Sequence, residues 1–202
     1  MPPLIWASDP LVAILDFETR HKSPAAAALF SWAVWAVDSL HYLDDIDSVY
    51  DTSYVTVGGH RPDVVDVAHA RWATGTAATA LDLCAAGLGR AFCNHNASKE
   101  LALVQFDPTE RRVQQRRTRL PPRACQWVDM VLADANYLQI KEARDWLTHS
   151  RLRRHFTLAA GGPPQRLELE LAVKVSVRKL IEEARDCTTR LVQGFVDTLP
   201  QL

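Results

Sequence analysis

Apolar side chains recur every three or four residues over long segments of this 202-residue chain, and this spacing constrains the fold more than any other feature. Because an α-helix has 3.6 residues per turn, residues at this spacing share one face. The segment 23–47 is therefore expected to form an amphipathic helix that packs against other helices. Its apolar stripe consists of Leu29, Trp32, Ala36, Leu40 and Leu43.

Helix-start signals divide the chain into further helical segments. Asp9 and Ser23 are each followed by a proline, which matches an N-cap residue with proline at the first helical position. Ser176 is expected to cap the last helix in the same way. Helices are predicted over residues 9–19, 23–47, 63–94, 123–149 and 176–199.

The period of the apolar pattern changes after residue 149. Apolar residues alternate with other residues in 152–158 and again in 167–177, where several are β-branched. Successive side chains of a strand point to opposite faces, so this alternation predicts two strands. The Gly-Gly-Pro-Pro sequence at 161–164 would supply the turn of a β-hairpin. Without a hairpin, the last helix would begin near Leu167.

These elements predict a mainly α-helical protein. The expected architecture is an antiparallel bundle of four main helices plus a short N-terminal helix, with a β-hairpin before the last helix. Residues 48–62, which contain Gly58 and Gly59, are expected to form a loop. The connections are too short for a second core, so residues 1–202 are expected to form a single helical domain.

Composition excludes several classes of protein. Charged or polar residues interrupt every apolar stretch before it reaches the about 18 residues of a membrane span. The start of the chain carries no positive charge ahead of an apolar block, so no secretory signal is expected. Scattered cysteines without a Cys-x-x-Cys pair are typical of reduced thiols in a cytoplasmic protein. We expect a cytoplasmic protein without a bound metal or cofactor. The cysteines are Cys84, Cys93, Cys125 and Cys187.

Charge is distributed unevenly along the chain. Residues 1–100 carry 6 Lys and Arg against 12 Asp and Glu, whereas residues 101–202 carry 17 against 12. The connection between residues 107 and 122 contains five of these arginines. Such a basic segment either contacts the phosphates of a nucleic acid or forms a solvated charged loop. The arginines of this connection are Arg111, Arg112, Arg116, Arg117 and Arg119.

The end of the predicted helix 123–149 carries Arg144, Asp145 and His149. An arginine can hold a phosphate, and an imidazole with its ordinary pKa of about 6.5 can move a proton near neutral pH. Asp145 lies four residues before His149, so its carboxylate is placed to orient the ring. On an ideal helix Arg144 and His149 point about 140° apart. They would address one atom only if the helix ended here or a second chain completed the site.

The spacing between Arg144 and His149 is not informative by itself, because Arg90 and His95 repeat it. The surroundings differ, since Arg144 is followed by an acid on a well-formed amphipathic helix. His149 also leads into a basic stretch. The alternative interpretation is that these residues are solvated groups at a helix C-terminus, where Arg and His are favoured.

An arginine, a polar residue, three further residues and a histidine near the end of a bundle helix resemble the signature of the HEPN superfamily. This resemblance implies a metal-independent endoribonuclease of the toxin or defence type, regulated by an antitoxin or similar protein. It also implies a homodimer whose interface brings two Arg–His pairs together on RNA. In this family the ribose 2′-hydroxyl attacks the adjacent phosphodiester. Some members carry a tyrosine shortly after the histidine, whereas Ser150 follows it here.

The resemblance assigns roles to individual residues. Arg144 and His149 would be the catalytic pair, with Asp145 as the polar partner. Independently of the resemblance, the positive charge of the basic residues on either side of the helix suits them to hold an RNA backbone. These RNA-binding candidates are Arg116, Arg117, Arg119, Arg151, Arg153 and Arg154.

Other functions are also compatible with the sequence. The bundle can be a non-catalytic binding or regulatory module of the same shape. It can also be a dimerisation domain that uses the small residues from Gly75 to Ala80. Asp38, His41 and Asp44 step by three along one helix, with Asp45 and Asp47 nearby. Their positions drift around the helix, so an acidic solvated helix end is expected there and not a metal site.

Overall fold

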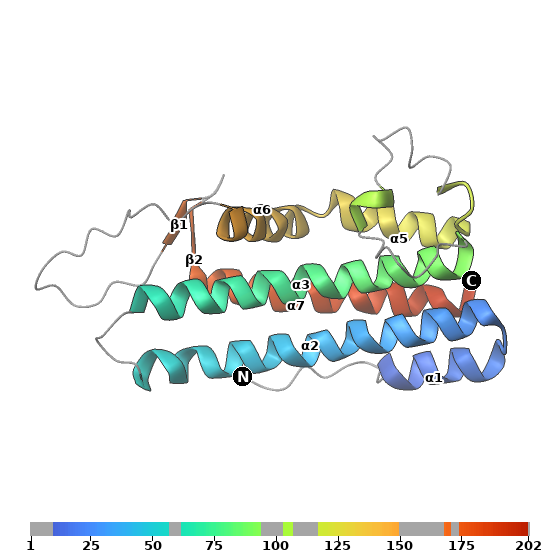
Figure 1. Cartoon of the computed structure of the whole chain (residues 1–202), viewed down its shortest axis with the longest axis horizontal. Coiled ribbons are helices and arrows are strands. Elements are labelled where there is room, and N and C mark those ends of the chain that lie inside the picture. The colour runs from blue at the N-terminus through green and yellow to red at the C-terminus, as the bar shows by residue number, and fades with distance from the viewer. Residues whose placement is uncertain are drawn as a thin grey trace, which may run out of the picture. The chain divides into compact units, whose positions relative to one another are not determined.

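The computed structural model describes residues 10–56, 62–93, 103–106, 117–149, 168–170 and 174–201. These residues form a mainly α-helical structure, as predicted (Figure 1). Two short 3₁₀ helices, η1 (Leu103–Phe106) and η2 (Leu199–Gln201), accompany the α-helices. The described α-helices are α1 (Pro10–Arg20), α2 (Pro24–Thr56), α3 (Pro62–Phe92), α5 (Pro122–Ala133), α6 (Ala135–His149) and α7 (Val177–Thr198).

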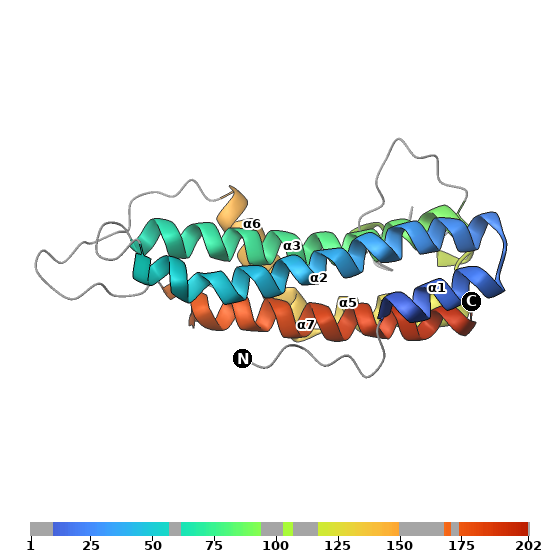
Figure 2. The ribbon, with the colours of Figure 1, turned by 90° about the horizontal axis from the view of Figure 1, so that it is seen from below.

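The chain divides into two compact units, and the long helices α2, α3 and α7 contribute residues to both. In each unit α2 and α3 lie side by side (Figure 2). The expectation that residues 1–202 form a single domain stays a prediction. Unit 1 comprises Met1–Ser39, Thr79–Ala133 and Thr189–Leu202, and unit 2 comprises Leu40–Ala78 and Asp134–Thr188.

The core of unit 1 is built around Trp127 of α5. Its side chain is buried, its Nε1 donates a hydrogen bond to the carbonyl of Leu191 at 2.8 Å, and its ring contacts Phe195 of α7. Gly87 of α3 allows a close approach to α2, since a Cβ at this position would lie 3.1 Å from the Cβ of Trp32. Asp82 of α3 fixes η1 by accepting a hydrogen bond from the backbone N of Leu103 at 2.7 Å.

Unit 2 contains the second half of α2, the first half of α3, α6 and the first half of α7. Its apolar core includes large side chains from α2, α6 and α7, whereas the buried apolar residues that α3 contributes are alanines. Several polar and charged residues are buried with them. Core residues of this unit include Leu43, Tyr50, Ile140, Leu147, Leu180 and Ile181.

Two of the expected helix caps are present. The hydroxyl of Ser23 accepts a hydrogen bond from the backbone N of Ala26 at 3.1 Å, and that of Ser176 accepts one from Lys179 at 3.3 Å. Asp9, the third expected cap, lies outside the described residues.

The prediction of a loop over residues 48–62 is wrong in its first part, because α2 continues to Thr56. Tyr50 is fully buried and donates a hydrogen bond to Asp66 of α3 at 2.6 Å. Packing of this kind outweighs weak local propensity. Residues 57–61 lie outside the described part.

The predicted helix 123–149 is also corrected, since Asp134 separates it into α5 and α6. The Asp134 carboxylate accepts hydrogen bonds from the backbone N atoms of Asn136 at 3.1 Å and Tyr137 at 3.0 Å. This is an N-cap arrangement, which satisfies amides that a helix start leaves without partners. Asp134 therefore begins a new helix where the apolar pattern alone indicates a continuous one.

Strands β1 (Glu168–Glu170) and β2 (Lys174–Ser176) pair antiparallel just before α7, with Leu169 opposite Val175. Both strands lie in the stretch that was expected to form a single strand. The two strands therefore run in opposite directions within this stretch. The expected partner strand and its turn at 161–164 fall outside the described residues.

Candidate functional site

Helix α6 carries Arg144 and Asp145 in its second half and ends at His149. Its buried face includes Ala143 and Leu147, which anchor the last turns in the core of unit 2. Arg144 and Asp145 are half-buried at the edge of this face. The predicted site therefore stands on a packed helix at the point where the helix ends.

Arg144 and Asp145 form an ion pair between adjacent residues. Nε and Nη2 of Arg144 donate to the same carboxylate oxygen, Oδ1 of Asp145, at 3.0 and 2.8 Å. Their side chains are 33% and 47% exposed. Solvent reaches both groups, so an anion that approaches Arg144 competes with Asp145 for the guanidinium.

The structure describes the backbone of His149 but not its side chain. The predicted orientation of the imidazole by Asp145 therefore stays a prediction. Asp145 instead accepts hydrogen bonds from Arg144 through Oδ1. This ion pair within the motif was not expected from the sequence.

A further arginine, Arg71 of α3, contacts the same end of α6. Its Nε and Nη2 donate hydrogen bonds to the carbonyl oxygen of Leu147 at 3.2 and 2.7 Å. Carbonyls in the last turn of a helix have no partner within the helix. Arg71 supplies one, and it brings a positive charge to within two residues of His149. The sequence carried no signal for this contact, which joins residues 76 positions apart.

The RNA-binding candidates fall into three groups. Arg116, Arg151, Arg153 and Arg154 lie outside the described residues. Arg117 is 16% exposed, and it donates to Asp129 at 2.6 Å and to the carbonyl of Phe106 at 2.9 Å. These contacts give Arg117 a structural role in unit 1. Arg119 is exposed, with one 3.4 Å contact to the carbonyl of Cys93.

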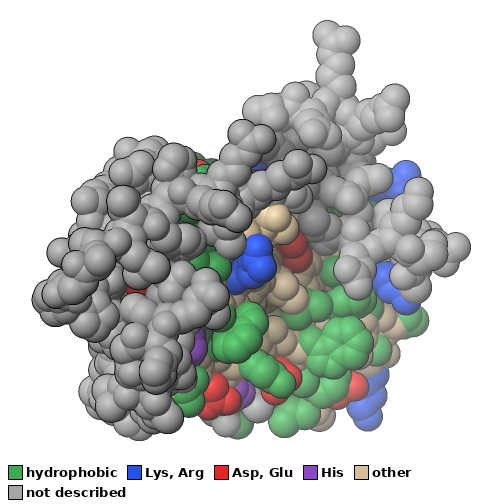
Figure 3. Space-filling model, turned by 60° about the vertical axis from the view of Figure 1, so that its left-hand side comes forward, with side chains coloured by type: hydrophobic (Ala, Val, Ile, Leu, Met, Phe, Trp, Pro, Cys, Tyr) green, Lys and Arg blue, Asp and Glu red, His purple; other side chains and the backbone are tan. Residues whose placement is uncertain are grey.

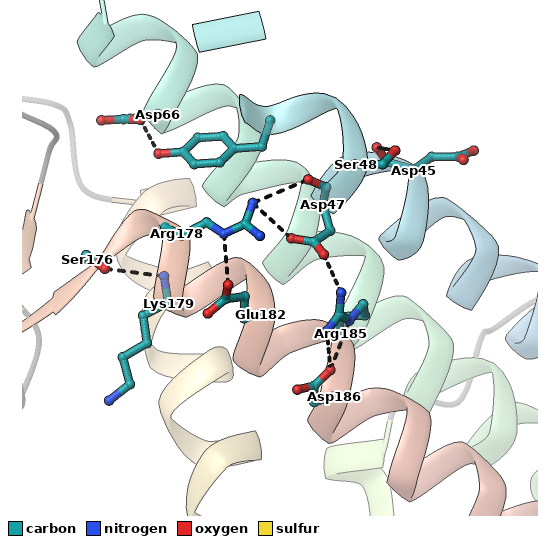
Figure 4. A network of polar contacts seen from close by, with 11 residues as sticks. Asp45, Asp47, Ser48, Asp66, Ser176, Arg178, Lys179, Glu182, Arg185 and Asp186 are labelled. Carbon is teal, nitrogen blue, oxygen red and sulfur yellow. Dashed lines mark hydrogen bonds and ion pairs between the residues drawn. The ribbon is translucent and has the colours of Figure 1, made fainter. Parts of the chain in front are cut away.

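Unit 2 also contains a buried charge network that sequence reasoning missed (Figure 4). Asp47 of α2 was assigned to an acidic, solvated helix end, yet it is only 6% exposed. Arg185 of α7 donates from Nη1 to its Oδ2, and Nη1 of Arg178 lies 3.3 Å from its Oδ1. The expectation of a solvated end fails at Asp47 because two arginines compensate its charge inside the core.

Each of these two arginines also donates a hydrogen bond to an acidic residue of α7. Nε of Arg178 donates to Glu182 at 2.9 Å, and Nε of Arg185 donates to Asp186 at 2.9 Å. A charge can be buried when its hydrogen-bonding capacity is used in this way. Figure 4 shows both arginines reaching from α7 toward Asp47. The charges of Asp47, Arg178 and Arg185 are thus compensated by one another and by Glu182 and Asp186, which indicates a structural role.

A repeated sequence could have pointed to this network. Glu-Ala-Arg-Asp occurs at 142–145 and again at 183–186. In both copies the arginine donates through Nε to the following aspartate, at 3.0 Å for Arg144 and 2.9 Å for Arg185. The copies differ in burial, since the Arg185 side chain is 10% exposed and that of Arg144 is 33% exposed.

Within the described ranges, no group of three His, Cys, Asp or Glu residues is arranged to hold a metal ion. Asp44 is half-buried, and burial raises the pKa of its carboxyl despite the opposing charges of Arg185 and His41. The four cysteines form no disulfide with one another. Among the described helices, none has both the length and the hydropathy that crossing a membrane requires.

Comparisons with known proteins give no further guide to function. No family model, no curated protein and no solved structure matches this chain.

Proposed function

We propose that the chain is a metal-independent endoribonuclease of the toxin or defence type, acting in the cytoplasm as a homodimer. The observation that supports this best is the solvent-accessible Arg144–Asp145 ion pair on the last turns of α6, a helix that ends at His149. Arg71 adds a second cation at the same helix end. Two cations and a histidine are suited to a phosphodiester substrate.

In this reaction the guanidinium of Arg144 exchanges Asp145 for a non-bridging phosphate oxygen. His149 takes the proton of the ribose 2′-hydroxyl, and the resulting oxygen attacks the adjacent phosphorus. The bond from phosphorus to the 5′-oxygen breaks, and this oxygen receives a proton from a second histidine. The products are a 2′,3′-cyclic phosphate and a free 5′-hydroxyl. This reaction consumes no water, and none of its steps uses a metal ion.

A homodimer would solve the geometric difficulty of the motif. Side chains five residues apart on one helix diverge by about 140°, so a base and an acid for one phosphate are supplied more easily by two chains. His149 of one protomer would act as base and the partner's His149 as acid. A further protein that covers this site at the dimer interface would act as antitoxin or regulator.

The test is cleavage of end-labelled RNA in the presence of EDTA. Wild-type protein should cut the RNA and leave a 2′,3′-cyclic phosphate, and His149→Ala should slow the cut at least about 100-fold. His95→Ala is the matched control, because His95 follows Arg90 at the same spacing. Cleavage that survives His149→Ala, or that EDTA stops, would falsify this mechanism.

Two observations favour a second candidate, a non-catalytic helical binding module. Both donors that Arg144 uses are already engaged by Asp145, so the pair is satisfied without RNA. Large apolar side chains are also exposed on unit 2, among them Tyr42 at 62% and Trp72 at 58%. Figure 3 shows hydrophobic and acidic side chains gathered together on one face of the molecule. A binding module of this kind would leave labelled RNA intact under every condition of the assay.

A further inference from the structure

The contact between Arg71 and the end of α6 fixes a backbone carbonyl of the last turn and brings a positive charge to the proposed site. Arg71 is an exposed residue of α3. Two of its three guanidinium nitrogens donate hydrogen bonds to one backbone oxygen, that of Leu147. Leu147 lies three residues after Arg144 and two before the helix ends. Within the described residues, Nη1 of Arg71 has no hydrogen-bond partner.

The end of a helix is a poor place for an anion. Peptide dipoles add up to about half a negative charge at the C-terminus, which favours cations and repels a phosphate. An enzyme that cuts RNA beside the end of α6 must overcome this repulsion. Arg144 is partly neutralised by Asp145 at 2.8 Å. The charge of Arg71, by contrast, is directed at the helix end itself.

We propose that Arg71 is a positioning residue of the Arg144–His149 site that fixes the last turn of α6 and contacts an RNA phosphate through Nη1. This role rests on the proposed function. Nε and Nη2 determine where the helix ends, and Nη1 together with the positive charge attracts the substrate. The charged groups that the described contacts place at this end of α6 are Arg144, Asp145 and Arg71.

An arginine is better suited to this double task than a lysine. Its planar fork can bind Leu147 through one edge while a further nitrogen stays available, whereas an ammonium is a point charge on a flexible stem. A lysine at position 71 should therefore keep the charge and lose the two-point contact with the helix. A methionine should lose both. These two substitutions separate the electrostatic part of the role from the structural part.

The experiment measures binding of a 2′-O-methyl RNA, which lacks the attacking hydroxyl, by fluorescence anisotropy at several salt concentrations. Each phosphate contact contributes about 0.7 to 1 to the slope of log K against log salt. Arg71→Met should lower this slope by about that amount and weaken binding several-fold. Arg71→Lys should keep the slope. Arg90→Met, at another exposed arginine of α3, should leave the binding constant within twofold of wild type.

Cleavage of unmodified RNA by the same variants distinguishes the two proposals. We expect Arg71→Met to raise KM more than it lowers kcat, and Arg71→Lys to restore most of KM. An unchanged salt slope in Arg71→Met, with only a lower melting temperature, would show that Arg71 is a helix cap and nothing more. If His149→Ala still cleaves while the slope changes as expected, the proposed chemistry fails and the phosphate contact of Arg71 stands. A wild-type protein that does not bind the modified RNA overturns both.

Discussion

Asp47 and Arg185 form an ion pair inside the core of unit 2, where the two residues are 6% and 9% exposed. The pair joins α2 to α7, and Arg178 and Asp186 complete it from either side. Removing one partner of a buried pair leaves the other charge without compensation. The network is therefore expected to fix how α2 and α7 pack within this unit.

Asp47→Ala should lower the free energy of unfolding by about 3 to 5 kcal/mol, because Arg185 and Arg178 would lose a buried counterion. Urea denaturation followed by circular dichroism measures this difference. Asp45→Ala is the matched control, since Asp45 is an exposed acid on the same helix and should change stability by less than about 0.5 kcal/mol. Equal effects of the two substitutions would contradict a structural role for Asp47.

The two Glu-Ala-Arg-Asp sequences allow the same substitution to be compared at a buried and an exposed arginine. Arg185→Ala should destabilise the protein by several kcal/mol, because Asp47 would stay buried after losing one of its two arginine counterions. Arg144→Ala should cost less than about 1 kcal/mol, since surface ion pairs contribute little, and should slow RNA cleavage about 100-fold or more. Thermal unfolding and the labelled-RNA assay together measure both effects. Loss of fold in Arg144→Ala would assign this motif to the core.

The sequence predicted the helices well because their apolar spacing is a direct consequence of burial on one face. Ser23 and Ser176 were correctly identified as caps, since such a cap depends on residues three positions away. The errors arise where distant contacts decide. Helix α2 continues to Thr56, and Tyr50 on this added stretch reaches Asp66 on α3. The helix is interrupted at Asp134, although the helical spacing of apolar residues continues on both sides of this residue.

The candidate site was predicted in part. The pattern placed Arg144 and Asp145 on one helix near its end, and the structure agrees. It did not indicate that Arg144 binds Asp145, nor that Arg71 binds the carbonyl of Leu147, because the latter depends on how α3 packs against α6. The side chain of His149 lies outside the described part, so its role stays a prediction.

The cap at the start of α6 can be tested by a pair of substitutions. Asp134→Ala removes the acceptor for the backbone N atoms of Asn136 and Tyr137, and should lower the free energy of unfolding by about 1 kcal/mol. Asp134→Ser keeps a side-chain oxygen at the cap and should recover most of this loss. Urea denaturation at neutral pH measures both variants. An unchanged stability of Asp134→Ala would mean that packing alone determines where α6 begins.

Asp44 predicts a dependence of stability on pH. Burial raises the pKa of its carboxyl in the folded protein above the value of the unfolded chain, so folding favours the protonated form. The ionised carboxylate therefore destabilises the protein above its folded pKa, and this penalty disappears as pH falls below the unfolded value. Asp44→Asn should stabilise the protein at pH 7 and show no advantage near pH 3. Melting temperatures of both proteins across this range provide the measurement, and a constant difference would exclude the ionisation of Asp44 as its cause.

Two glycines of α3 should respond to the same substitution with opposite signs. Among the described residues, a Cβ at Gly75 would meet no atom within 4 Å, whereas one at Gly87 would lie 3.1 Å from the Cβ of Trp32. Alanine is favoured over glycine in a helix by about 0.5 to 1 kcal/mol, so Gly75→Ala should raise the free energy of unfolding by that amount. Gly87→Ala gains the same propensity but must move α2 and α3 apart in unit 1, and overpacking of this kind costs about 1 to 3 kcal/mol. Urea denaturation of the two variants should therefore show midpoints on either side of wild type. A lower midpoint for Gly75→Ala would indicate that its open side is covered by another chain, as expected for a dimerisation helix with small residues at its centre.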